Sequence, residues 1–234
     1  MKTAAIILAG GTGRRIGADI PKQLLKTGGR TIIEYTISAF EEHPLIDEIC
    51  IVSHADWITQ TEALVSRAGF RKVKHIITGG KERSDSSQAA IKLYEADDIL
   101  LIHDGARPLV SRRIISDCVS AMKSCNAAGV AIPATDTGWQ ADTSRQLCTI
   151  PPRETLFLAQ TPQVFRCSVI AEAYSLAATD TDFHPTDDCS VVARYLKKEK
   201  IKIIEGDSRN IKITNPQDLL LMQMLLEKKE QTKL

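Results

Sequence analysis

The chain has 234 residues, 43% of them hydrophobic, which is enough to bury one substantial core. Its 30 lysines and arginines nearly balance 29 aspartates and glutamates, so the formal net charge of +1 offers no general basic field for nucleic acid. The apolar stretches are shorter than the roughly 18 residues of a membrane span, and the opening run is too short for a signal peptide. We therefore expect one domain over residues 1–234, in the cytoplasm, without membrane or nucleic-acid partners.

Strand-like and helix-like patterns alternate along the first half of the chain. This alternation predicts right-handed βαβ units and an α/β fold, a Rossmann-like and mostly parallel sheet flanked by helices. The expected strands are residues 3–9, 46–52, 73–77, 98–103 and 128–133, and the expected helices are residues 31–40, 57–68, 84–94 and 112–124.

Residues 134–157 break this alternation and are expected to form a β-arm. Two extended segments, 137–142 and 145–150, flank a turn at Asp142-Thr143-Ser144. An arm this small cannot bury its own apolar residues, so it must rest on something else. Two interpretations stay open, a dimerisation element that packs on a second subunit and a flap on the protein's own surface.

The six cysteines show no spacing typical of a zinc site or a disulfide framework. No pair has the C-x-x-C arrangement, and several lie inside apolar segments. We expect small buried hydrophobic residues in a reducing compartment. These residues are Cys50, Cys118, Cys125, Cys148, Cys167 and Cys189.

The first strand runs directly into a glycine- and arginine-rich loop, residues 10–22. Glycines there let backbone N–H groups close around phosphate oxygens, and Arg15 and Lys22 add positive charge. A dinucleotide fingerprint would need a small residue where Ile16 stands, and the chain has no Walker sequence. The remaining interpretations are the G-G-x-G-x-R loop of nucleotidyltransferases and an ordinary turn with chance basic residues.

Polar segments also follow two later strands, residues 78–86 and 103–108. In doubly wound sheets ligands bind beyond the carboxyl ends of the strands, so these segments should converge with the first loop. Asp104 could be a Mg²⁺ ligand or the N-cap of the next helix. Arg107 could hold an anion or pair with a nearby carboxylate.

The second half of the chain offers fewer patterns. Arg153 and Thr161 flank a stretch that leads into Pro162, where any helix must end. Lys212 is the single charge between Ile211 and Ile213. It could snorkel outward from an edge strand or point into a phosphate site.

Taken together, segments 9–23, 79–86, 103–108, 161–165, 186–190 and 210–218 resemble the cytidylyltransferases of polyol phosphates, in particular the 2-C-methyl-D-erythritol 4-phosphate cytidylyltransferase family. The resemblance implies a nucleotidyltransferase fold and a reaction of CTP with a sugar-alcohol phosphate, giving a CDP-alcohol and pyrophosphate. It also implies a homodimer whose arms exchange, bringing Thr137 and Arg153 into the partner's site.

Site residues follow from the same resemblance. Arg15, Lys22 and Lys212 would be catalytic, and Asp104 would lie beside Mg²⁺. The residues implied in CTP binding are Ala9, Gly10, Gly11, Gly13, Gly80, Lys81, Ser86, Asp104 and Gly105, and those implied in acceptor binding are Arg107, Thr137, Arg153, Thr161 and Thr186.

Two departures from the family pattern keep alternatives open. The chain has Leu8-Ala9-Gly10-Gly11 where the family commonly has Pro-Ala-Ala-Gly, and Gly138-Trp139 where a hydrophobic residue and a lysine are common. The Leu-Ala-Gly-Gly opening also resembles ribitol 5-phosphate cytidylyltransferases. A sugar-1-phosphate nucleotidyltransferase that uses UTP or GTP would share the opening loop. A non-catalytic nucleotide-binding domain is a further alternative, although it should have lost its basic residues.

Overall fold

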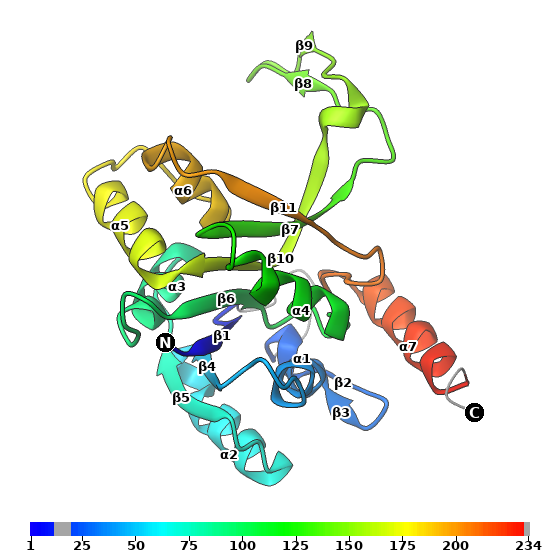
Figure 1. Cartoon of the computed structure of the whole chain (residues 1–234). Coiled ribbons are helices and arrows are strands. Elements are labelled where there is room, and N and C mark those ends of the chain that lie inside the picture. Colours follow the sequence, from blue (N-terminus) through cyan, green and yellow to red (C-terminus); the bar gives the residue numbers. More distant parts are fainter. Residues whose placement is uncertain (12–19, 232–234) are drawn as a thin grey trace.

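The computed structural model describes residues 1–11 and 20–231, and its centre is a seven-stranded sheet (Figure 1). The strand order is β11-β7-β10-β6-β1-β4-β5. β10 is antiparallel to both β6 and β7, and the other pairings in this sheet are parallel, which confirms the expected mostly parallel fold. The strands are β1 (Thr3–Ala9), β4 (Glu48–Ser53), β5 (Val73–Thr78), β6 (Ile99–Asp104), β7 (Ala127–Pro133), β10 (Phe157–Arg166) and β11 (Ile201–Glu205).

Helices cover both faces of this sheet. α1 (Ile32–Glu41), α2 (Ile58–Ala68) and α4 (Arg112–Ala121) pack on one face, and α3 (Arg83–Ile91), α5 (Cys167–Ala177) and α6 (Asp188–Tyr195) pack on the other. α7 (Pro216–Gln231) packs against α1 through Met222 and Ile32. Short elements complete the chain: η2 (Lys22–Leu24), β2 (Lys26–Thr27), β3 (Arg30–Thr31), η3 (Ala55–Trp57), β8 (Gln140–Ala141), β9 (Leu147–Thr149) and η4 (Arg153–Thr155).

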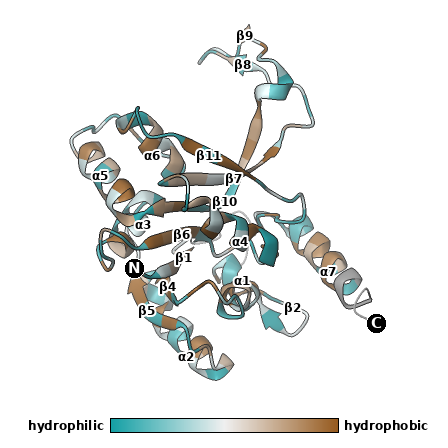
Figure 2. Cartoon of the chain, viewed as in Figure 1, coloured by the Kyte–Doolittle hydropathy of each residue, from teal (hydrophilic) through white to brown (hydrophobic). Residues whose placement is uncertain are grey.

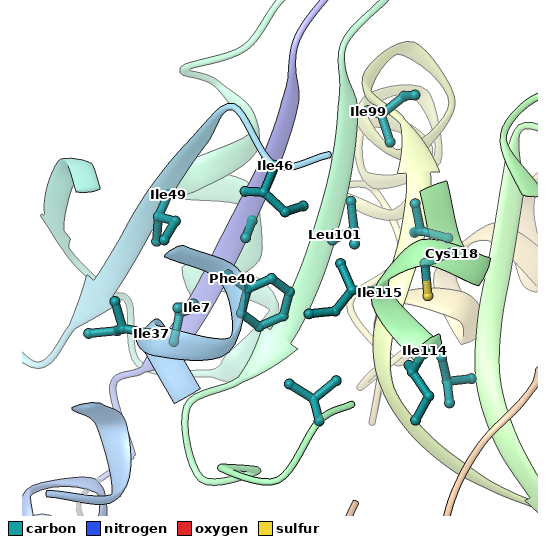
Figure 3. Packing of buried hydrophobic residues seen from close by; sticks show 14 of the residues in the cluster. Ile7, Ile37, Phe40, Ile46, Ile49, Ile99, Leu101, Ile114, Ile115 and Cys118 are labelled. Atoms are coloured by element: carbon teal, nitrogen blue, oxygen red, sulfur yellow. The ribbon is translucent and has the colours of Figure 1, made fainter. Parts of the chain in front are cut away.

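The core follows from the two-residue period of the strands. In β1, Ile7 belongs to the core beneath α1 and α4, while Ile6 belongs to the core beneath α3 and α5. Phe40 and Ile115 fill the first core side by side with Leu101 (Figure 3). The central strands are therefore largely hydrophobic, as their brown colour shows in Figure 2.

β10 is a central strand that the sequence patterns did not predict. It lies between β6 and β7 and contains Pro162, a residue that cannot donate to a strand ladder. The pairing of β10 with β7 is interrupted between Ala159 and Gln163, so the proline falls where the ladder is already broken. α5, α6 and β11 were likewise not predicted, whereas the expected elements before residue 134 are present with shifted ends.

The arm at residues 134–157 stands away from the sheet (Figure 1). Its two extended segments are shorter than expected, because only β8 and β9 pair. Trp139 is 71% exposed, and Leu147 and Ile150 are each 51% exposed. The arm thus leaves apolar side chains without cover from the described part of its own chain.

All six cysteines lie in the described residues and are free thiols. Cys50, Cys118 and Cys167 are buried as expected, but Cys148 is exposed on β9, so the expectation of burial is wrong there. Within residues 1–11 and 20–231, no helix has the length and apolar character needed to cross a membrane.

Candidate active site

A pocket of ≈ 260 Å³ lies where β1 and β6 end, beside the loop that follows β5. The convergence expected of the three polar segments is therefore observed. The pocket brings together nine of the predicted site residues. Its lining is Leu8, Ala9, Gly10, Gly11, Lys22, Gln23, Gly80, Lys81, Glu82, Arg83, Ser86, Asp104, Ala106 and Lys212.

Backbone forms much of one wall of the pocket. A Cβ on Gly80 would lie 2.1 Å from the Cβ of Asp85, so only glycine lets the chain pass this close to the start of α3. The Ser86 hydroxyl accepts from the backbone N–H of Gly80 at 3.3 Å and holds the loop in place. Gln23 donates to the carbonyls of Ala9 and Gly11, the latter at 2.9 Å.

Three cations surround the carboxylate of Asp104. Lys212 Nζ lies 2.9 Å from Asp104 Oδ2, and the Nε atoms of Arg83 and Arg107 lie 3.5 Å from its two oxygens. Burial opposes ionisation of this carboxyl, but Lys212 and Arg83 outweigh it and hold the pKa of Asp104 well below its usual range. Asp104 is therefore a permanent anion in a cationic pocket. It ends β6 and does not cap a helix, because Ser111 caps α4.

A buried hydrogen-bond chain supports Asp104 from behind. Thr161, which is 4% exposed, accepts from the Asp104 backbone N–H at 3.1 Å and contacts His103 Nδ1 at 3.0 Å. His103 Nε2 lies 3.0 Å from the Arg107 carbonyl, which can only accept, so Nε2 carries the proton and Thr161 donates to Nδ1. Complete burial lowers the pKa of His103 to about 4, so the ring is neutral.

Lys212 lies on an irregular segment, so the edge-strand interpretation is wrong; the edge strands of the sheet are β11 and β5. Hydrogen bonds tie this segment to the loop that follows β6. Ile213 N–H donates to the Ala106 carbonyl, and an Arg107 N–H donates to the Asn210 carbonyl, both at 2.8 Å. Lys212 is held between these two anchors, so its ammonium reaches Asp104.

Several predicted residues do not line the pocket. Gly105 packs against β1, where an added Cβ would lie 3.0 Å from the Leu8 carbonyl oxygen. Arg107 and Thr161 lie behind Asp104 in the contacts described above. The structure places Thr137, Arg153 and Thr186 at exposed positions outside the lining, and Gly13 and Arg15 lie outside the described residues.

Arg83 is the main site residue to which no sequence pattern assigned a role. It opens α3, where the helix dipole disfavours a cation, and that conflict is the signal that could have identified it. Its Nη1 lies 2.5 Å from the carboxylate of Asp188, and Asp188 also accepts from the Tyr174 hydroxyl at 2.7 Å. Gln23 and Asn210, both buried, are two further residues that position this site.

A mostly parallel sheet with a cationic, glycine-walled pocket at its carboxyl edge is the architecture of a nucleotidyltransferase. Residues 3–228 match the family model described as 2-C-methyl-D-erythritol 4-phosphate cytidylyltransferase. The chain belongs to this family.

Individual relatives that cover nearly the whole chain carry this family's name, and one carries a different name. The Thermobifida fusca protein named 2-C-methyl-D-erythritol 4-phosphate cytidylyltransferase is 42% identical over 232 residues, covering 96% of this chain and 93% of the relative. A solved structure of 4-diphosphocytidyl-2C-methyl-D-erythritol synthase from Anaerococcus prevotii superposes with a TM-score of 0.84 at 25% identity, covering 97% of this chain and 96% of its own. The Haemophilus influenzae bifunctional ribulose 5-phosphate reductase/CDP-ribitol pyrophosphorylase Bcs1 is 41% identical over 230 residues, which are 97% of this chain and 48% of that protein.

Proposed function

We propose that this chain transfers CMP from CTP to 2-C-methyl-D-erythritol 4-phosphate, giving the CDP-alcohol and pyrophosphate. Family membership supports this reaction, and so does the pocket at the carboxyl ends of β1 and β6. The observation that carries the proposal is the set of lysines that line the pocket, Lys22, Lys81 and Lys212, along a wall built largely of glycine backbone. This combination suits a triphosphate, because donors and positive charge are already oriented.

The chemistry needs positioning more than proton transfer. An oxygen of the acceptor phosphate attacks the α-phosphorus of CTP, and the bond between that phosphorus and the bridging oxygen of the β-phosphate breaks. The second pKa of a phosphate monoester is about 6, so the nucleophile is ionised near neutral pH and no general base is required. Lys22 and Lys212 stabilise the charge that develops on the α-phosphate and on the leaving pyrophosphate. Arg15 shares this role in the proposal.

Asp104 is the residue that fits a divalent cation. Mg²⁺ in nucleotide sites is commonly held by one or two carboxylates together with substrate phosphates. Asp104 offers an ionised carboxylate at the pocket, and residues 1–11 and 20–231 contain no group of three or more metal-binding side chains that would form a protein cage. Bound there, Mg²⁺ would supply electrostatic stabilisation of the triphosphate. Asp104 would orient the ion, and its buried supports would fix that orientation.

Acceptor binding is assigned to residues around and beyond the pocket. Thr186 precedes α6, and the arm carries Thr137 and Arg153, whose Nη1 donates to the Thr135 carbonyl at 3.2 Å. In the proposal Arg107 and Thr161 contribute to acceptor binding indirectly, because both contact Asp104 and hold it in place. The single domain, residues 1–234, forms a homodimer in which the arm, residues 134–157, reaches a partner's site. The exposed Trp139 and the neighbouring apolar side chains on the arm support this arrangement.

The dimer has its own test. Leu147→Glu puts a charge on the exposed apolar face of the arm and should shift the protein to monomer in light scattering after size exclusion. Leu93→Glu, at a 43% exposed residue in the body, is the matched control and should leave the mass unchanged. A wild-type monomer at micromolar concentration would refute the dimer. The free thiols support a cytoplasmic location, where thiols stay reduced.

Ribitol 5-phosphate is the second candidate acceptor. The 41% identity to the Haemophilus influenzae protein and the shared Leu8-Ala9-Gly10-Gly11 opening favour it. Pyrophosphate release with CTP and Mg²⁺ distinguishes the acceptors. Turnover preferring the methylerythritol phosphate supports the first proposal, and preference for ribitol 5-phosphate replaces the acceptor while the mechanism stays. Absence of turnover with either, or a preference for UTP or GTP, refutes the proposed reaction.

A further inference from the structure

Arg83 connects two carboxylates that belong to different parts of the molecule. Its Nη1 contacts Asp188 at 2.5 Å, and its Nε lies 3.5 Å from Asp104 Oδ1. Arg83 directly follows the nucleotide loop, residues 79–82, while Asp188 opens α6 directly after the segment that contains Thr186. The guanidinium therefore links Asp104 to Asp188 at the start of α6, while the backbone of Arg83 continues the nucleotide loop.

The Arg83–Asp188 pair is buried at a place where a charge pair is costly. The Asp188 side chain is fully buried and that of Arg83 is 23% exposed. Burial would lower the pKa of Arg83, but Asp188 and Asp104 reverse this and raise it above its ordinary value. Apolar residues of similar volume would often serve the fold equally well in such a position. Stabilisation of the fold alone therefore does not explain well why a buried ion pair stands at this position.

Asp188 is itself firmly placed. Tyr174 donates its hydroxyl to Asp188 Oδ1 at 2.7 Å, and Gln163 Oε1 accepts from the backbone N–H of Asp188 at 2.9 Å. These contacts reach Asp188 from α5 and β10, so its carboxylate holds the guanidinium of Arg83 in a fixed position. The longer contact of Arg83, the one with Asp104, depends on this anchoring by Asp188.

One hydrogen-bond donor of Arg83 is unused, which would not be expected if the residue served only to bridge two parts of the fold. Its Nη2 is buried without a hydrogen-bond partner. Buried polar groups are satisfied in the great majority of cases, so an orphaned N–H requires a reason. This orientation of the guanidinium leaves Nη2 without a partner but directs Nε toward Asp104, the carboxylate proposed to hold Mg²⁺.

We propose that Arg83, anchored by Asp188, is a positioning residue that orients Asp104 and keeps the nucleotide loop in register with the acceptor segment. This inference rests on the proposed function, because it assigns Asp104 to the bound Mg²⁺ and nucleotide. Arg83 acts through Asp104. Loss of the pair should weaken metal-assisted nucleotide binding and turnover even in a well-folded protein.

The test compares Arg83→Gln, Asp188→Asn and the double variant. Each single variant leaves one buried charge without its partner, so a loss of stability there is expected and carries no weight. The double variant removes both charges and should keep a thermal midpoint near that of the wild type. Its kcat should nevertheless fall by about 10–100-fold, the usual effect of removing a group that orients a metal ligand.

A binding measurement separates positioning from general damage. Calorimetric titration should show the Kd of CTP with Mg²⁺ weakened about 10-fold or more in the double variant, while the Kd of CTP without metal changes much less. The control is Arg194→Gln, which removes another ion pair of α6, Arg194–Asp180 at 2.8 Å, whose arginine side chain is 51% exposed. It should leave both affinities and kcat unchanged.

The outcomes are distinct. A folded double variant with wild-type kcat and wild-type affinity for CTP with Mg²⁺ would overturn the inference and leave the pair structural. If the double variant does not fold, Arg83→Lys decides, because a single ammonium cannot reach both carboxylates. Reduced kcat at a wild-type thermal midpoint then supports the inference, and wild-type kcat overturns it. Failure of the proposed function is recognised separately, since the wild-type protein itself would then release no pyrophosphate.

Discussion

Thr161→Val distinguishes two roles for Thr161, support of Asp104 and direct contact with the acceptor. Valine has nearly the same shape as threonine but cannot hydrogen-bond. In the structure the hydroxyl accepts from the Asp104 N–H at 3.1 Å and contacts His103 Nδ1 at 3.0 Å. Both contacts are buried, so water cannot replace the lost partner.

The expected loss of stability can be worked out from these two contacts. An orphaned buried N–H costs about 1–3 kcal/mol, and the lost bond to the ring nitrogen adds about 1 kcal/mol. The free energy of unfolding should therefore fall by about 2–4 kcal/mol, which corresponds to a shift of the urea midpoint of about 1 M or more at an ordinary m-value. Urea unfolding followed by circular dichroism measures this shift. Thr161→Ser keeps the hydroxyl and is the matched control.

Activity then reports which role the hydroxyl has. If it supports Asp104, Thr161→Val should lower kcat while the acceptor KM changes little, and Thr161→Ser should retain most of the rate. A valine variant as stable as the serine variant, with only the acceptor KM raised, would contradict the reasoning. That result would place the hydroxyl in direct contact with the acceptor.

Three other substitutions probe the site and its support. Lys212→Met should lower kcat by about 100-fold or more in the pyrophosphate assay with little change in the thermal midpoint, because it removes a preorganised charge from a half-exposed position; a loss below about threefold would exclude Lys212 from catalysis. Burial lowers the pKa of His103 from 6.5 to about 4, so between these two pH values the imidazole is protonated in the unfolded chain and neutral in the folded protein. The free energy of unfolding should therefore fall as the pH drops from 6.5 to 4, by about 3 kcal/mol in total. Urea titrations at several pH values should show a flatter dependence for His103→Gln than for the wild type, and equal slopes would refute the assignment. Gly105→Ala should cost about 1–3 kcal/mol, since its Cβ would lie 3.0 Å from the Leu8 carbonyl oxygen. Gly11→Ala, whose Cβ would meet no described residue within 4 Å, should leave stability unchanged, and equal thermal midpoints of the two variants would contradict this packing argument.

The alternation of elements up to residue 133 could be predicted because each strand there is a short apolar run between turn signals. Beyond residue 133 the arm was predicted, but β10, α5, α6 and β11 were not. β10 contains Pro162, which locally argues against a central strand, and the compensating break in its pairing with β7 is visible only in three dimensions. The two strand pairings of β10, with β6 and with β7, therefore depended on long-range contacts that no local pattern encodes.

The site divides in the same way. Gly10, Gly80 and Asp104 could be located because they lie at or just after the ends of strands, and these ends must meet at one edge. The support of Asp104 by Thr161 could not be predicted, since the two residues are 57 positions apart and are joined by the unpredicted β10. The same applies to Arg83, whose partner Asp188 is 105 positions away.

The exposure of the three cations around Asp104 suggests how they divide their tasks. The side chain of Arg107 is 11% exposed, that of Arg83 is 23% exposed and that of Lys212 is 40% exposed. The two guanidiniums are also bound elsewhere, Arg107 to the Asn210 carbonyl and Arg83 to Asp188, so moving either would break a second buried contact. Lys212 is a single charge on a flexible stem, and it can turn from Asp104 to an incoming phosphate at lower cost. Transfer of Lys212 would free one side of the carboxylate for a metal ion while the two arginines hold its orientation.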